Sequence, residues 1–195
     1  MGLRHPLVSL DLFLKILRKQ SGEKKSDCLE GITVYCFNSH NDDACREIVT
    51  SLSPDVIVLA PASTIIRKNI LKIPEIGTIN AHMGKLPEFR GMNALEWTIL
   101  KTGKAYISVH FVDEGVDTGE ILRVSQIPLN KPNLGMMRVF ARKEMANLLA
   151  EVLADLSGGN IDTRPQQNND GKQYFIMHKK LLEYTNNLLE KIVDR

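Results

Sequence analysis

Alternating apolar and polar stretches along the chain predict strands separated by helices. Short apolar runs of strand length lie at 32–37, 55–60, 77–80, 105–112 and 120–129. Apolar residues at steps of three and four predict helices at 7–19, 39–54, 63–74, 93–103, 134–156 and 181–192. This alternation is typical of an α/β protein with a mostly parallel sheet and helices on both faces.

Length and charge narrow the class of protein. The chain has 195 residues, of which 43% are hydrophobic, enough for the core of one domain. Lys and Arg number 25 against 23 Asp and Glu, and the resulting net charge of +2 is too small for a dedicated nucleic-acid surface. We therefore expect no nucleic-acid partner.

Cysteine spacing and apolar run length indicate a cytoplasmic protein. Cys28, Cys36 and Cys45 form neither a C-x-x-C zinc pair nor a disulfide framework, so reduced thiols are expected. The N-terminal apolar run is interrupted by charges and precedes its basic cluster, unlike a signal peptide. No apolar run approaches the length of a membrane span, so no membrane partner is expected.

Two polar residues lie where the third predicted strand ends. Asn80 and His82 are separated by one residue, and alternate residues of a strand share a face. The carboxyl ends of parallel strands are where α/β proteins usually carry their chemistry. An amide and an imidazole are therefore expected side by side at a candidate site.

A second unusual stretch, 109–122, reads VHFVDEGVDTGEIL and carries four acidic residues between two predicted strands. Taken alone, it fits a solvated turn. It does not fit a calcium loop, because acidic side chains do not recur at every second position and no glutamate closes twelve residues. His110, inside the preceding strand, is expected to have a structural role near the site.

The dinucleotide, P-loop, serine-hydrolase and zincin motifs are absent from the sequence. What remains resembles a known family. The segments N-A-H, L-P-E-F-R-G and S-V-H-F-V-D-E-G-V-D-T-G-E-I-L are similar to the signature blocks of the 10-formyltetrahydrofolate-dependent formyltransferases. That family includes glycinamide ribonucleotide, methionyl-tRNA and sugar N-formyltransferases. The resemblance is strongest over residues 55–129.

The resemblance implies a Rossmann-like formyltransferase fold and a catalytic set of Asn80, His82 and Asp117. Attack of an amine on a formyl group places negative charge on oxygen, which the Asn80 amide and a protonated His82 could stabilise. Asp117 would favour the charged imidazole and relay protons. No metal is needed for this chemistry.

The resemblance also implies the formyl donor, 10-formyltetrahydrofolate, and two segments that bind it. The first is Ser63, Thr64, Ile65 and Ile66, and the second is Val112, Asp113, Glu114, Gly115 and Val116. Little chain follows the last strand, so the expected acceptor is a small amine, an amino sugar on a nucleotide ahead of glycinamide ribonucleotide or methionyl-tRNA. Formyltetrahydrofolate hydrolysis and a catalytically weak folate-binding module are the alternatives.

The chain departs from the family at its beginning. Members open with strand, helix and strand, whereas here the first convincing strand is 32–37. We expect a catalytic domain over 1–165, incomplete at its N-terminus, with the polar loop and helix of 166–195 packed on it. A missing central strand leaves backbone groups unpaired, so the chain is expected to be marginally folded or to form a homo-oligomer.

Overall fold

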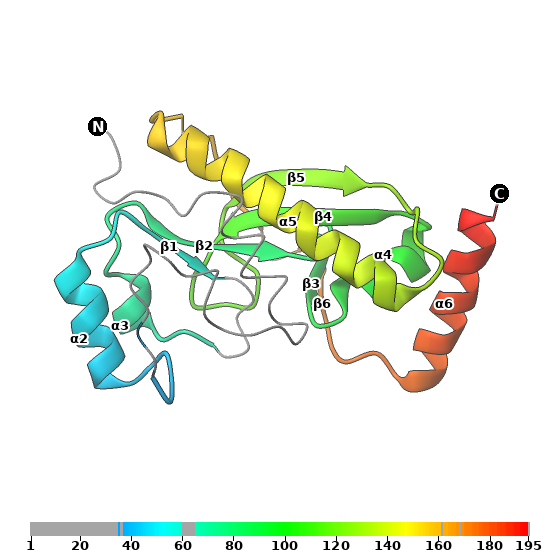
Figure 1. Cartoon of the computed structure of the whole chain (residues 1–195), viewed down its shortest axis with the longest axis horizontal. Coiled ribbons are helices and arrows are strands. Elements are labelled where there is room, and N and C mark those ends of the chain that lie inside the picture. The colour runs from blue at the N-terminus through cyan, green and yellow to red at the C-terminus, as the bar shows by residue number, and fades with distance from the viewer. Residues whose placement is uncertain (1–34, 36, 60–64, 161, 168, 195) are drawn as a thin grey trace, which may run out of the picture.

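The computed structural model describes residues 35, 37–59, 65–160, 162–167 and 169–194 (Figure 1). A four-stranded sheet has the order β1-β2-β4-β5, and a separate pair joins β3 to β6. The strands are β1 (Val56–Leu59), β2 (Gly77–His82), β3 (Phe89–Gly91), β4 (Ala105–Phe111), β5 (Ile121–Ile127) and β6 (Lys172–Tyr174). The helices are α2 (Asp43–Leu52), α3 (Lys68–Leu71), α4 (Ala94–Thr102), α5 (Leu134–Ser157) and α6 (Lys179–Val193).

The predicted α/β architecture is confirmed by this order of elements. The predicted helix 7–19 lies outside the described residues, as does most of the predicted strand 32–37, of which Tyr35 and Phe37 are described and are not in a strand. Among the described helices, none is long and apolar enough to span a bilayer.

The directions of the described strands differ from the expected mostly parallel sheet. β1 and β2 are parallel, whereas β2 with β4 and β4 with β5 are antiparallel. The connection from β4 to β5, residues 112–120, is too short for a crossover that would make these strands parallel. The β2–β4 connection is long enough for either direction, so the apolar pattern could not distinguish them.

The two faces of the β2–β4 pair have opposite character. Ile79 and Ala81 of β2 and Ile107 and Val109 of β4 belong to the apolar core. The residues between them project to the other face, which carries polar side chains. Helices are therefore expected on the apolar face alone at this part of the sheet.

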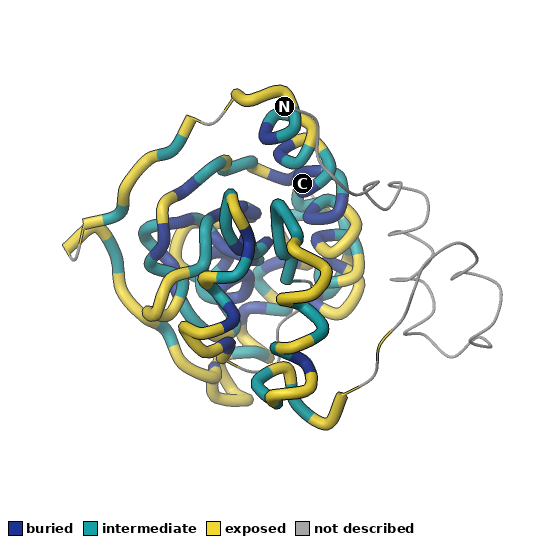
Figure 2. Tube along the Cα trace, turned by 90° about the vertical axis from the view of Figure 1, so that its left-hand side faces the viewer, coloured by how far each residue is buried: buried dark blue, intermediate teal, exposed yellow. Residues whose placement is uncertain are grey.

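Helix α5 lies along that apolar face (Figure 1). Its buried residues, Met137, Ala141, Leu148 and Val152 among them, recur at helical spacing and pack with the strands in one core. The side chain of Asn133 caps the helix by accepting a hydrogen bond from Met136 N at 2.9 Å. Buried positions lie toward the middle of the trace and exposed ones along the outer loops (Figure 2).

Helices α4 and α6 extend the same core. Leu95 and Ile99 of α4 and Leu189 of α6 are almost completely buried within it. The first turn of α5 is tied to α6 by a hydrogen bond from Leu134 N to the side chain of Asn186 at 2.9 Å. The C-terminal helix α6 therefore packs on the same core as α4 and α5.

The predicted helix 63–74 is shorter than expected. The structure forms α3 over Lys68–Leu71, and the described residues 65–67 before it are outside the helix, with Arg67 in an extended conformation. The Asn41 side chain accounts for this difference, because its amide donates to Ile65 O at 2.9 Å and its oxygen accepts from Arg67 N at 2.8 Å. These backbone groups are thereby bonded outside a helix.

The pairing of β3 with β6 was not predicted, because residues 164–173 carry no apolar run and indicate a loop. Close backbone contact holds the pair together. A Cβ at Gly171 would lie 1.8 Å from Pro87 O, and one at Gly91, where φ is +89°, would lie 2.3 Å from Tyr174 O. Glycine is required at both positions by these approaches.

Candidate functional site

A row of polar side chains crosses the face of the sheet opposite α5. Asn80 and His82 project from β2, and Ser108 and His110 project from β4. The antiparallel register sets Asn80 opposite His110 and His82 opposite Ser108. Asn80 Nδ2 lies 3.3 Å from His110 Nε2. Asn80 and His82 therefore lie on the same face of β2, as strand alternation predicts, and His110 and Ser108 of β4 lie beside them.

The Asp117 carboxylate reaches this row from the acidic loop. Its Oδ2 lies 3.3 Å from His82 Nδ1, and its Oδ1 lies 3.5 Å from His110 Nε2. Oδ2 also accepts a hydrogen bond from Gly91 N at 2.7 Å. Asn80, His82 and Asp117, which are far apart in sequence, are therefore linked through His110 into one cluster.

Both ring nitrogens of His82 face acceptors. Nε2 lies 2.7 Å from Phe89 O, and because a carbonyl can only accept, this nitrogen carries a hydrogen. Nδ1 faces the Asp117 carboxylate. A second proton on the ring would consequently be shared between His82 Nδ1 and Asp117.

Burial and charge oppose one another at this pair. Burial lowers the pKa of His82, and although the Asp117 charge and the Phe89 carbonyl raise it, the net direction is downward. Burial alone would raise the pKa of Asp117, but the hydrogen bond from His110, the neighbouring His82 and the Gly91 N–H hold it at about 2. Asp117 is therefore ionised, and the expected protonated His82 is disfavoured in the resting site.

A loop after β2 covers the cluster and is fixed by Ser108. The Ser108 hydroxyl donates to Gly84 O at 2.7 Å and accepts from Leu86 N at 3.1 Å. A Cβ on Gly84 would lie 2.7 Å from both His82 Nε2 and the Ala94 side chain. The absence of a side chain at Gly84 therefore lets this loop pass directly over the imidazole.

An ion pair links the second segment predicted to bind folate to helix α3, which follows the first segment. Lys68, two residues after the first segment, forms an ion pair with Glu114 of the second. Ile65 is 78% exposed and Val116 is 38% exposed, whereas Ile66 is buried. Ser63 and Thr64 lie outside the described residues.

The remainder of the second segment has a local structural role. Val112 N donates to Thr78 O at 2.7 Å, which continues the β2–β4 pairing. The Asp113 carboxylate accepts from Gly115 N at 3.0 Å and from the Thr118 hydroxyl at 2.6 Å. These bonds shape the turn that brings Asp117 back to the sheet.

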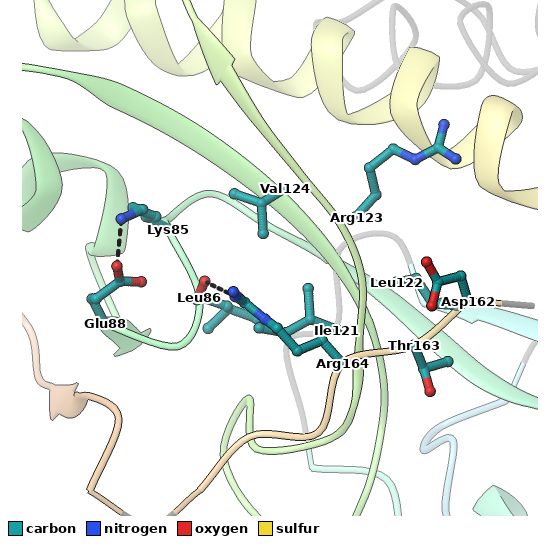
Figure 3. A pocket seen from close by; sticks show the side chains of 10 residues that line it. All are labelled: Lys85, Leu86, Glu88, Ile121, Leu122, Arg123, Val124, Asp162, Thr163 and Arg164. Atoms are coloured by element: carbon teal, nitrogen blue, oxygen red, sulfur yellow. Dashed lines mark hydrogen bonds and ion pairs between the residues drawn. The ribbon is translucent and has the colours of Figure 1, made fainter.

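Two pockets among the described residues are lined by none of Asn80, His82 and Asp117. One, of about 320 Å³, lies between the loop after β2, the outer edge of β5 and residues 162–164 (Figure 3). Arg164 points across it to Leu86 O at 3.4 Å, while Arg123 points away toward α5, where it pairs with Asp155 and Glu151. The other, of about 610 Å³, adjoins the end of α5.

Some contributors to the cluster could not be identified from sequence. His110 was expected near the site, and its spacing from Ser108 repeats the N-x-H alternation of β2. Arg90, Gln166 and the Phe89 carbonyl carry no sequence signal of their own, because their contacts depend on the pairing of β3 with β6.

Comparison with known proteins identifies the fold and the relatives. A family model described as formyl transferase matches residues 17–152. A methionyl-tRNA formyltransferase from Clostridioides difficile (strain 630) is 33% identical over 155 residues, covering 77% of this chain and 49% of the relative. The chain spans about half the length of the curated relatives it matches.

Solved structures share the fold. The formyltransferase PseJ from Anoxybacillus kamchatkensis, in complex with UDP-4,6-dideoxy-4-formamido-L-AltNAc and tetrahydrofolate, has a TM-score of 0.65 at 20% identity and covers 92% of this chain and 94% of its own. Phosphoribosylglycinamide formyltransferase from Streptococcus pneumoniae TIGR4 has a TM-score of 0.54 at 27% identity, covering 65% and 75%.

Proposed function

This chain belongs to the formyl transferase family, and from that premise we propose that it transfers a formyl group from 10-formyltetrahydrofolate to a primary amine. The observation that carries the proposal is the convergence of Asn80, His82 and Asp117 on one face of the sheet. An amide donor, an imidazole and an ionised carboxylate are the groups that acyl transfer to an amine requires.

Asn80 supplies the electrostatic part of the proposed mechanism. As the acceptor nitrogen attacks the formyl carbon, negative charge develops on the formyl oxygen. The Asn80 amide nitrogen, which lies 3.3 Å from His110 Nε2, would donate a hydrogen bond to this oxygen. Loss of one donor of this kind typically costs about 2.7 to 4 kcal/mol of transition-state stabilisation.

His82 and Asp117 move the proton. The acceptor amine loses a proton as the new C–N bond forms, and the departing folate nitrogen gains one as the old C–N bond breaks. The released proton is held between Asp117 Oδ2 and His82 Nδ1, where the carboxylate stabilises the imidazolium that forms. A His82 that is neutral at rest is suited to accept this proton, which it then returns to the leaving group.

The formyl donor would be bound by the two joined loop segments. Exposed Ile65 and Val116 would contact the pterin ring, and the ion pair of Lys68 with Glu114 would hold the segments together. Backbone N–H and C=O groups of the acidic loop would form hydrogen bonds with the polar edge of the pterin ring.

We propose an amino sugar attached to a nucleotide as the acceptor. The likeness in fold to PseJ, with a TM-score of 0.65, prompts this choice of acceptor. The structure of PseJ contains a UDP-linked formamido sugar. Glycinamide ribonucleotide and methionyl-tRNA are the competing acceptors, since relatives named for both are similar to this chain.

A panel of acceptors tests the proposal. Purified protein is incubated with 10-formyltetrahydrofolate and, in turn, UDP-4-amino sugar, glycinamide ribonucleotide, methionyl-tRNA or no amine, and the formylated product is identified by mass spectrometry. We expect the formamido sugar. Formate released without an amine would establish a hydrolase instead, and folate binding without any product would establish a binding module.

A further inference from the structure

Gln166 connects two elements of the candidate site through hydrogen bonds to backbone carbonyl groups and to the Arg90 side chain. It lies between α5 and β6, in the polar stretch that the sequence indicated as a loop. Its Nε2 donates to Asp117 O at 3.0 Å and to Gly119 O at 2.6 Å. Its Oε1 accepts from Arg90 Nε at 3.0 Å. One half-buried amide thus joins the acidic loop to β3.

The orientation of this amide is determined by its partners. A guanidinium only donates and a carbonyl only accepts, so the oxygen of Gln166 must face Arg90 and its nitrogen must face the two carbonyls. Glutamine is suited to this position, because it presents an acceptor and two donors on one side chain. A glutamate would retain the acceptor and lose both donors.

Asp117 is the residue that needs such support. Its φ of +53° is in the left-handed region, which costs a non-glycine residue roughly 1 kcal/mol or more. Its carboxylate must remain within 3.5 Å of both His82 and His110. The Gln166 amide bonds the carbonyl of this strained residue and that of Gly119, which restrains the backbone on which the carboxylate is carried.

The contacts form a closed ring. Gln166 bonds Arg90, the next residue Gly91 donates its N–H to the Asp117 carboxylate, and Asp117 O returns to Gln166. Arg90 is 7% exposed and is also bonded to Gln167 O at 3.3 Å. Movement of the carboxylate relative to His82 therefore requires a hydrogen bond of the ring to break.

We propose that Gln166 is a positioning residue for formyl transfer, which acts by fixing the Asp117 carboxylate against His82. The inference rests on the proposed function for its catalytic consequence. Its geometric part, the alignment of Asp117 with His82, can be measured without turnover.

Three variants separate positioning from general stability. Gln166→Met removes all three hydrogen bonds at similar side-chain length, and Gln166→Glu keeps a partner for Arg90 while losing both donors. Gln167→Met is the matched control, because the neighbouring Gln167 is exposed and bonds Arg90 and Asp170 through its backbone. A displacement of about 1 Å can cost roughly 100-fold in rate, so we expect kcat to fall 10- to 100-fold in both Gln166 variants and to stay unchanged in the control.

A double-mutant cycle tests whether Gln166 affects kcat through Asp117. If Gln166 acts through Asp117, adding Gln166→Met to Asp117→Ala lowers kcat no further, and the dissociation constant for tetrahydrofolate stays within about twofold. Additive losses, or wild-type kcat in Gln166→Glu, would overturn the inference. Thermal melts of each variant identify any that merely unfold.

An NMR titration of His82 distinguishes failure of this inference from failure of the proposed function. The Asp117 charge raises the pKa of His82, so Asp117→Asn should lower it. Gln166→Met should lower it in the same direction, and Gln167→Met should leave it unchanged. Unchanged titration in Gln166→Met refutes positioning, whereas a wild-type protein that formylates no acceptor refutes the function alone.

Discussion

Asp117→Asn should remove an acid-sensitive part of the stability. The environment of Asp117 lowers its pKa from an ordinary 3.8 to about 2. At 1.36 kcal/mol per pKa unit, ionisation of this carboxylate contributes roughly 2 kcal/mol to the free energy of unfolding near neutral pH. The side chain is 16% exposed, so solvent screening removes little of this contribution.

Because the pKa of Asp117 is lowered in the folded protein, its ionised carboxylate stabilises the fold near neutral pH and loses this effect in acid. A carboxyl group whose folded-state pKa is depressed stabilises the protein above its unfolded pKa, and this contribution is lost as pH falls from about 4 to about 2. About half of it should already be lost at pH 3. Asparagine has the same shape and can still accept from Gly91 N, but it does not titrate.

The assay is urea unfolding of wild type and Asp117→Asn at several pH values from 7 to 3. We expect the stability difference between the two proteins to shrink by about 1 kcal/mol over this range. A difference for Asp117→Asn that is constant across pH would refute the reasoning.

Three further predictions concern chemistry, packing and ligand binding. His82→Ala should lower kcat by orders of magnitude while folate still binds. Turnover above about a tenth of wild type would exclude the proposed role, because it corresponds to a loss of under roughly 1.4 kcal/mol. Gly171→Ala should lower the free energy of unfolding by about 1–3 kcal/mol because its Cβ would meet Pro87 O, whereas Gly158→Ala, with ordinary contacts, should be nearly neutral in denaturant melts. A reduced folate at a hundred times its dissociation constant should stabilise the chain by about 2.7 kcal/mol in a thermal melt, and Ile65→Ser should weaken binding without lowering the stability of the free protein.

The local sequence pattern correctly predicted most described elements and one half of the candidate site. The run at 77–80 with Asn80 and His82 on one face became β2, because a period of two is a property of the strand itself. The helix predicted at 134–156 became α5, since its apolar residues at steps of three and four need one covered face. The helix predicted at 63–74 was wrong in extent because a distant side chain, Asn41, bonds the backbone there.

The sequence alone was thus enough to predict most of the longer strands and helices, the apolar face of β2 and, through its signature segments, the family. Tertiary structure decided that Asp117 reaches His82, that β4 runs antiparallel to β2, and that Gln166 closes a ring with Arg90. Periodicity reports only whether one side of an element is buried. Strand direction, loop conformation and contacts between distant residues depend on which surfaces pair across the whole chain, and a local pattern does not contain that information.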